Sequence, residues 1–86
     1  MHVLLPSPLF SYTRGQMRVE ATADSLAQLL VSLDARFPGL RHRIIDEQDR
    51  VRRHIRMFVN GEATTSLDQR LRADDEVLIV AALSGG

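Results

Sequence analysis

The chain has 86 residues and a mass of 9.7 kDa, so we expect one small domain with a single thin core. Its eleven basic residues are all arginines, balanced by eleven acidic residues, and it contains no lysine, cysteine or tryptophan. These absences exclude a disulfide framework, a thiolate nucleophile, a cysteine-ligated metal centre and a Schiff-base lysine. Any sulfur or acyl chemistry must therefore use a group other than a side-chain thiol or amine.

The first half of the chain predicts two strands followed by a helix. Residues 2–5 are apolar and end at a proline, and residues 17–21 alternate apolar and polar side chains after Gly15, which together indicate a β-hairpin with a short glycine-containing loop. Thr22 or Asp24 can cap the helix that follows. Its buried stripe is Leu26, Leu29, Leu30, Leu33 and Phe37, and Pro38-Gly39 ends it.

The second half predicts further strands separated by short irregular segments. Ile44 and Ile45 indicate a short helical turn, and residues 46–53 a surface loop. A strand over residues 55–59 ends at the turn signal Asn60-Gly61, and residues 62–65 return as a short strand. Residues 66–71 indicate a single helical turn, residues 73–75 a turn, and residues 76–82 a last, apolar strand.

This order predicts an α+β domain spanning residues 1–86, in which the last strand lies beside the first and the helix packs across one face of the sheet. Alternation places Ile55, Met57, Val59, Val77 and Ile79 inside. Phe58, Leu78 and Val80 then lie on the open face beside Arg56, where they predict a docking patch for a partner. The alternative is that residues 39–53 fold over this face and make these side chains a second small core.

Other candidate sites are weak. His2, His42 and His54 lack metal-ligand spacing, Ser84 has no partner base, and the acidic pair at residues 74–75 fits a turn. No glycine-rich phosphate loop is present, so we expect no directly bound cofactor. Residues 41–56 hold six arginines and three acids without interleaved aromatics, which favours a solvated surface first, steering toward an acidic partner second, and nucleic-acid binding least.

We expect a cytoplasmic protein that binds no membrane. The longest apolar run, residues 77–83, is too short to span a bilayer, and the N-terminus lacks the pattern of a signal peptide. The most informative residues are the last two, because Gly85-Gly86 follows the last predicted strand after only Leu83-Ser84. A flexible tail over residues 83–86 would therefore leave a rigid sheet and end in a carboxylate.

With these features together, the sequence resembles the MoaD/ThiS family of ubiquitin-like sulfur carriers. The resemblance rests on the β-β-α start, the turn over residues 59–62, the entry into the last strand over residues 74–77, and Gly85-Gly86. The segments Val3-Leu4-Leu5-Pro6 and Thr13-Arg14-Gly15-Gln16 look closest to the branch used in cysteine biosynthesis. The resemblance implies a β-grasp fold with a mixed sheet of four to five strands and one main helix on one face.

It also implies that the protein is a carrier and co-substrate, not an enzyme. An E1-like adenylating and sulfurtransferase partner would use ATP to activate the Gly86 carboxylate, and sulfur would then be carried covalently there as a thiocarboxylate. An acceptor enzyme of the cysteine synthase, molybdopterin synthase large-subunit or thiazole synthase type would receive the sulfur. Gly85 would let the tail stay extended in a narrow channel, with Leu83 and Ser84 touching the partner.

Two other functions remain open from the sequence. The chain could be a ubiquitin-like modifier conjugated through Gly86 to a target lysine. It could also be a β-grasp binding module that uses the sheet face without covalent chemistry, in which case the glycines are incidental.

Overall fold

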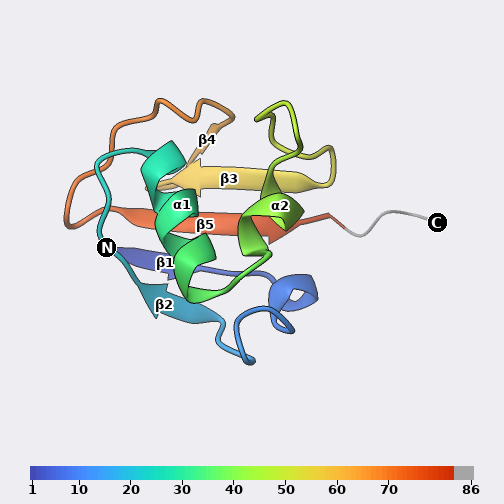
Figure 1. Ribbon diagram of the computed structural model, residues 1–86. Coiled ribbons are helices and arrows are strands. Elements are labelled where there is room, and N and C mark those ends of the chain that lie inside the picture. Colours follow the sequence, from blue (N-terminus) through green and yellow to red (C-terminus); the bar gives the residue numbers. More distant parts are fainter. Residues whose placement is uncertain (83–86) are drawn as a thin grey trace.

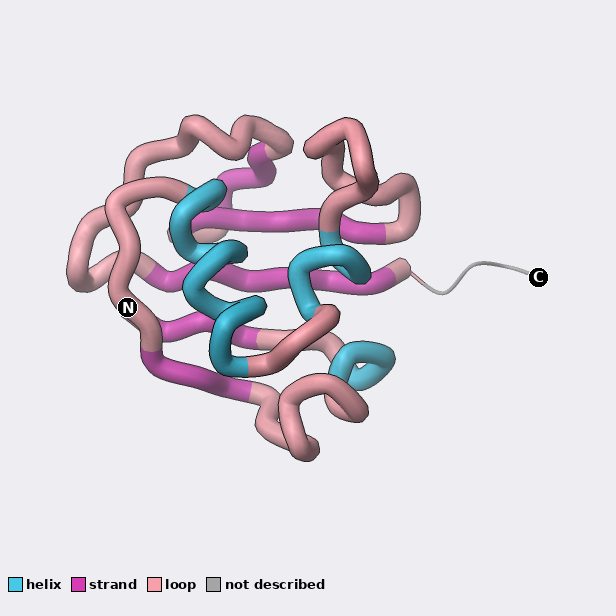
Figure 2. Tube along the Cα trace, viewed as in Figure 1, coloured by secondary structure: helices cyan, strands magenta, loops and turns pink. Residues whose placement is uncertain are grey.

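The structure is a computed structural model that describes residues 1–82. Its described residues form a five-stranded mixed sheet, and two α-helices lie across one face (Figures 1 and 2). The elements are β1 (His2–Leu4), the 3-10 helix η1 (Ser7–Leu9), β2 (Arg18–Glu20), α1 (Leu26–Arg36), α2 (Leu40–Ile44), β3 (Ile55–Val59), β4 (Glu62–Thr64) and β5 (Glu76–Ala81). The predicted flexible tail, residues 83–86, lies outside the described residues.

The strand order β2-β1-β5-β3-β4 confirms that the last strand lies beside the first. β1 pairs parallel with β5, with Leu4 opposite Leu78, and antiparallel with β2. β5 pairs antiparallel with β3 on its other side and is therefore the central strand of the sheet. The predicted hairpin of β1 and β2 is confirmed, but its connection is long, because residues 5–17 include η1.

The N-cap of helix α1 lies one residue after Asp24, the second of the two predicted capping positions. Ser25, in extended conformation, is the N-cap, and its Oγ accepts a hydrogen bond from the Gln28 N–H at 3.2 Å. The Gln28 side chain reaches back and accepts from the Asp24 N–H at 2.6 Å, in the manner of a capping box shifted by one residue. The prediction of Thr22 or Asp24 as the cap is therefore wrong.

Helix α2 and the loop after it follow directly from the end of α1. Gly39, at φ +94°, is the residue before α2, and the positive φ explains a glycine there. Ile44 lies in α2 as predicted, whereas Ile45 is extended and bridges to Val51. The bridge encloses residues 46–50, the first part of the loop that the sequence predicts over residues 46–53.

The turn between β3 and β4 is confirmed in detail. Asn60 and Gly61 have φ values of +51° and +85°, as in a two-residue turn that follows the twist of the strands. The helical turn predicted over residues 66–71 is wrong: these residues contain one turn closed by Gln69 N–H to Ser66 O, and Arg70 then bridges to Ser25. A long-range pairing has replaced a local helix.

The core lies between the helices and the sheet. The predicted helical stripe is buried, with Leu26, Leu29, Leu30 and Leu33 fully inaccessible and Phe37 nearly so. The inward sheet residues Ile55, Met57, Val59, Val77 and Ile79 are buried as predicted. Within residues 1–82, no helix is both long and apolar enough to cross a membrane.

Candidate functional site

The first part of the candidate site is the end of β5. Its last residue, Ala81, lies opposite Ile55 of β3, and the Ala82 N–H donates to the His54 carbonyl at 2.6 Å. Strand β1 holds the other side of β5 in parallel register. The strand that precedes the last residues is thus the centre of the sheet, paired with β1 over its first half and with β3 up to Ala81 (Figure 1).

The second part is the open face of the sheet, opposite α1 and α2. Phe58 of β3 and Leu78 of β5 lie directly across from each other, and Val80 lies across from Arg56. Both strands bury the alternate residues on the helical side, so these side chains belong to the open face. Phe58, Leu78 and Val80 lie on the open face as predicted but are half-buried, and the cross-strand pairing of Phe58 with Leu78 and of Val80 with Arg56 contributes to this.

Residues 39–53 do not cover this patch. Leu40, Ile44 and Ile45 are buried in the core, and Val51 packs against the same core. Figure 1 shows α2 beside α1, in front of the sheet. The alternative of a second small core on the open face is therefore wrong for the part of the chain that the structure describes.

The alternation of β1 adds residues to the patch that the sequence analysis did not assign. Leu4 lies opposite Leu78, and Ala63 of β4 lies opposite Phe58. One cross-strand row thus runs through Leu4, Leu78, Phe58 and Ala63, with Val80 beside it. The signal for Leu4 was the period-two pattern of the first strand, but its use required knowing that β1 and β5 pair in parallel. We call Leu4, Phe58, Ala63, Leu78 and Val80 the sheet patch.

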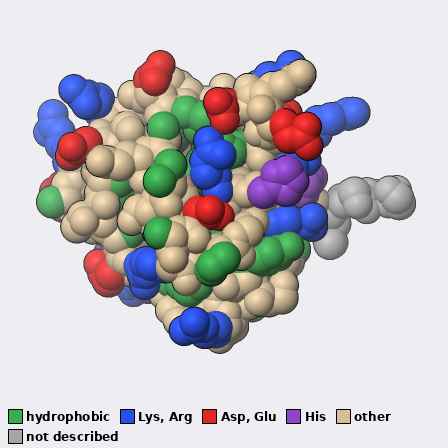
Figure 3. Space-filling view, in the orientation of Figure 1, with side chains coloured by type: hydrophobic (Ala, Val, Ile, Leu, Met, Phe, Trp, Pro, Cys, Tyr) green, Lys and Arg blue, Asp and Glu red, His purple; other side chains and the backbone are tan. Residues whose placement is uncertain are grey.

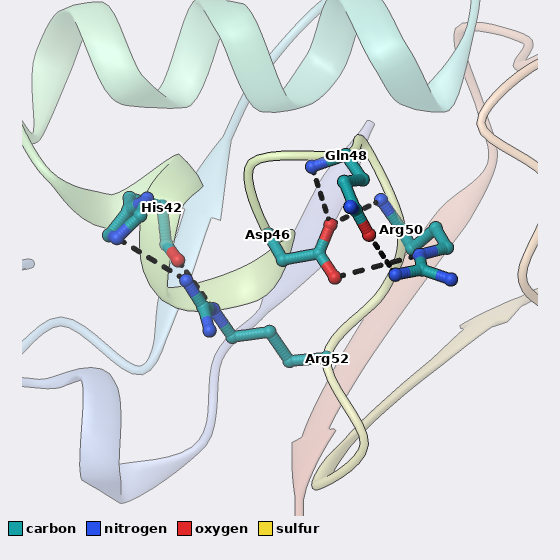
Figure 4. Close-up of polar contacts among 5 residues, drawn as sticks. All are labelled: His42, Asp46, Gln48, Arg50 and Arg52. Carbon is teal, nitrogen blue, oxygen red and sulfur yellow. Dashed lines mark hydrogen bonds and ion pairs between the residues drawn. The ribbon is translucent and has the colours of Figure 1, made fainter.

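The third part is the arginine-rich loop after α2, which a single carboxylate organises (Figure 4). Asp46 Oδ1 accepts hydrogen bonds from the Gln48 N–H at 2.8 Å and the Arg50 N–H at 3.0 Å, and the Asp46 N–H donates to the Arg50 carbonyl at 2.8 Å. The backbone hydrogen bond from Arg50, followed by that from Gln48, holds the pKa of Asp46 below its usual value. Sequence analysis missed this role, although aspartate is a frequent organiser of such turns.

Arginine side chains fix the same loop to α2. Arg52 Nε donates to the His42 carbonyl at 2.7 Å, and its Nη2 lies 3.3 Å from the His42 ring (Figure 4). Arg41 pairs with Asp49 at 3.0 Å. A surface hollow is lined by Asp46, Arg50, Val51, Arg52, Arg53 and His54. This hollow lies next to the end of β5, because His54 bonds to Ala82.

The described residues offer binding surfaces more than reactive groups. No cluster of three or more metal-ligating side chains occurs within residues 1–82. His42 contacts Arg52, and His2 contacts Glu20. Arg56 donates to the carbonyls of Arg53 and Ile55. The other predicted site residues, Leu83, Ser84, Gly85 and Gly86, lie outside the described part.

Known proteins are similar to this chain along nearly its whole length. Residues 3–86 match the ThiS family. The sulfur carrier protein CysO of Mycobacterium tuberculosis is 29% identical over 89 residues, which cover 98% of this chain and 96% of that protein.

Solved structures agree with the fold. The chain is similar to a structure of the BexX/CysO complex of Amycolatopsis orientalis, with a TM-score of 0.90, 26% identity and coverage of 99% of this chain and 98% of that chain. It is also similar to SAMP1 of Haloferax volcanii, with a TM-score of 0.78, 27% identity and coverage of 100% and 98%. The architecture is therefore the β-grasp fold of ubiquitin-like proteins.

Proposed function

The chain belongs to the ThiS family, and from this premise we propose that it is a sulfur carrier whose reactive group is the Gly86 carboxylate. The observation that carries the proposal is the match to this family up to Gly86, beyond a central strand that ends at Ala81. The match to curated sulfur carrier proteins along 98% of the chain supports it. The absence of cysteine and lysine from the sequence leaves no side-chain thiol or amine to hold the cargo.

The proposed reaction has two steps on a partner enzyme. A Gly86 carboxylate oxygen attacks the α-phosphorus of ATP, pyrophosphate leaves, and an acyl adenylate results. Hydrosulfide then attacks the acyl carbon, AMP leaves with the bonding electron pair, and a proton is released as the thiocarboxylate forms. A persulfide donor would give an acyl disulfide instead, and a second thiol would release the thiocarboxylate as it forms a disulfide with the donor.

The carrier contributes positioning to this chemistry. The two terminal residues have no Cβ, so their backbone can approach a nucleotide closely. We assign the sheet patch, with Arg56, Leu83 and Ser84, to contact with the adenylating enzyme and then with an acceptor enzyme of the cysteine synthase, molybdopterin synthase large-subunit or thiazole synthase type. The likeness to the BexX/CysO complex supports a carrier that works in complex with another protein.

Intact mass spectrometry tests the reaction. Wild-type protein incubated with the adenylating enzyme of its host, ATP, magnesium and sulfide should gain the mass difference between sulfur and oxygen. Deletion of Gly86 should abolish this gain, because the remaining carboxylate is one residue too short to reach the reacting atoms. Gly86→Ala keeps the length and the carboxylate and should lower the rate strongly, since its Cβ narrows the fit.

The melting temperature is the control for both variants. It should equal that of wild type, because the hydrophobic core that residues 1–82 form is unchanged in both. Wild-type protein that never acquires sulfur under these conditions contradicts the proposal.

The second candidate, a protein modifier, is favoured by the similarity to SAMP1. The same incubation with a cell extract distinguishes the two, because a modifier would appear joined by an isopeptide bond from Gly86 to a target lysine. Without lysine, the chain offers no side-chain acceptor for a second copy of itself.

A further inference from the structure

The zero net charge of this protein hides a strong separation of charge. Segments 5–18 and 39–56 hold eight of the eleven arginines and three of the eleven acidic residues, a surplus of five positive charges. The described remainder therefore carries three arginines and eight acidic residues, a surplus of five negative charges. The two sets lie in different parts of the molecule.

The strand register shows where the positive set lies. β1 and β5 run parallel, so the loop after Leu4 and the end of β5 are on the same side of the molecule. β3 begins at Ile55 opposite Ala81, which brings the preceding loop to that side as well. Figure 1 shows these loops around the end of β5, and Figure 3 shows arginine and histidine side chains on that side together with acidic ones.

Three of these arginines lie on the segment that pairs with the end of β5. Arg53 is next to His54, whose carbonyl accepts from the Ala82 N–H, and Arg52 and Arg56 flank the same turn. None of the three forms an ion pair with a carboxylate within residues 1–82. Arg53 and Arg56 are exposed and Arg52 is half-buried. We call Arg52, Arg53 and Arg56 the arginine face.

Two of the three side chains of the arginine face are hydrogen-bonded to the folded domain. The Arg52 N–H donates to the Ile44 carbonyl at 3.0 Å and its side chain to the His42 carbonyl. Arg56 donates through Nη1 to the Arg53 carbonyl at 2.7 Å. These contacts satisfy backbone acceptors and position Arg52 and Arg56 before any partner arrives, whereas Arg53 is exposed. Asp46 lies near Arg52 and offsets part of its charge, and a surplus of positive charge remains on the face. Such a cluster favours a complementary charged surface.

We propose that the arginine face docks against an acidic surface of the adenylating enzyme, a surface that borders the entrance through which the carrier's tail reaches the reacting atoms. This inference rests on the proposed function, because it assigns a surface to the partner of that reaction. The attraction orients the carrier so that the end of β5 approaches first, while the acidic half of the carrier is repelled. It therefore sets the rate and the direction of encounter.

Nucleic acid is a poorer match to the same face. Single-stranded nucleic acid is usually held by a basic groove with aromatic side chains for base stacking. The arginine-rich segment 39–56 contains no aromatic residue, and the acidic half of the molecule would repel a phosphate backbone. A protein surface with a local acidic patch needs no aromatic side chains for stacking, and it can contact the arginine face without approaching the acidic half of the molecule.

The test compares two charge reversals that change the net charge equally. Arg53→Glu alters the arginine face, whereas Arg70→Glu alters an exposed arginine among the acidic residues at the other end of the sheet. At about 0.05 M salt, Arg53→Glu should raise the KM of the adenylating enzyme for the carrier about three- to tenfold, and Arg70→Glu should not raise it. At about 0.5 M salt the difference should become much smaller, because the Debye length has fallen to about 4 Å and the longer-range attraction is screened. The kcat at saturating carrier should stay unchanged for both variants.

A photo-crosslinker at residue 53 then identifies the partner surface. Adducts should lie beside aspartate or glutamate residues, and reversing those carboxylates to arginine should restore the KM of Arg53→Glu. Equal KM values for wild type and Arg53→Glu at low salt, with normal thiocarboxylate formation, would overturn the docking inference alone. A wild-type protein that forms no thiocarboxylate would instead overturn the proposed function. The docking inference would also be overturned if Arg53 were needed for binding a single-stranded RNA oligonucleotide, or for self-association, and had no effect on the KM.

Discussion

At the scale of single residues, Asp75 joins the start of β5 to the turn between β3 and β4. Its Oδ1 accepts from the Asn60 side chain at 2.8 Å and its Oδ2 from the Arg72 N–H at 2.7 Å. Asn60 in turn exchanges backbone and side-chain hydrogen bonds with Glu76 at 2.9 Å. The hydrogen bond from the Arg72 backbone, followed by that from Asn60, holds the pKa of Asp75 below its ordinary value of 3.8.

This lowered pKa predicts a loss of stability in acid. Because the folded protein binds the Asp75 proton more weakly than the unfolded chain does, the stabilisation is complete above pH 3.8 and is lost as the pH falls through the folded pKa. Asp75→Asn should lower the melting temperature at neutral pH, since the amide presents a donor where a second acceptor is needed. Its melting temperature should also fall less steeply than that of wild type between about pH 5 and about pH 2.

Asp74→Asn is the matched control, because Asp74 is exposed and next in sequence. It should leave the melting temperature and its acid dependence close to wild type. Thermal unfolding by circular dichroism over the pH series measures both variants, and identical acid profiles for the two would contradict the assignment.

At the scale of elements, sequence was sufficient where a pattern is local and repetitive. Buried and more exposed side chains alternate at every position of β3. The sequence therefore predicted both its bounds, Ile55–Val59, and its buried face correctly. The sequence misled where distant backbone decides the structure. Ser25, the N-cap of α1, forms a β-bridge with Arg70. The chain after Ser66 is therefore extended at Arg70 and does not continue as a helix. Neither Ser25 nor Arg70 carries a local signal of the other.

The sheet patch shows the same division. Alternation within β3 and β5 was enough to assign Phe58, Leu78 and Val80 to one face. Leu4 joins them only through the parallel pairing of β1 with β5, a long-range contact that no local pattern contains. The arginine-rich loop lies on the helical side of the sheet because Ile44 and Ile45 are buried in the core there. The hydrophobic pattern of the sequence alone did not predict on which face of the sheet these two residues are buried.

The proposed role of the sheet patch gives a prediction at this scale. Val80→Glu places a charge in the patch, and Val31→Glu makes the same change on the exposed side of α1, on the opposite face of the domain. Val80→Glu should raise the KM of the adenylating enzyme for the carrier about tenfold, because an apolar contact of valine size is lost. Val31→Glu should leave the KM unchanged, and steady-state kinetics with both variants measures it.

Melting temperatures recorded in parallel show whether Val80→Glu remains folded. If the two folded variants have equal KM values, the sheet patch does not contact the enzyme.

At the scale of the whole molecule, the composition gives a net charge of zero, but it does not show that positive and negative residues lie in different parts of the fold. The run of arginines in residues 41–56 was visible in the sequence, where a solvated surface was its first interpretation. Only the topology shows that this run and the loop after β1 meet at the end of β5. The resulting polarity is a property of the fold, because it depends on which strand ends lie together.

Charge separation predicts chromatographic behaviour that net charge does not. Near its pI of about 6.8 the protein should still bind a sulfonate cation exchanger at low salt, through the arginine-rich end. Arg53→Glu should elute at clearly lower salt than Arg70→Glu, although both substitutions change the net charge by the same amount. A salt gradient at a fixed pH measures this without any partner enzyme, and co-elution of the two variants would contradict the separation.

The central position of β5 also determines how the domain bears a mechanical load. In the proposed function, withdrawal from a partner would pull on β5 from its last residue, Ala81. The ladders of β5 to β1 and β3 run along the strand, so a pull along it would load their hydrogen bonds together in shear. An edge strand would have only one such ladder. Two ladders therefore give β5 more resistance to being pulled out of the sheet than an edge strand would have.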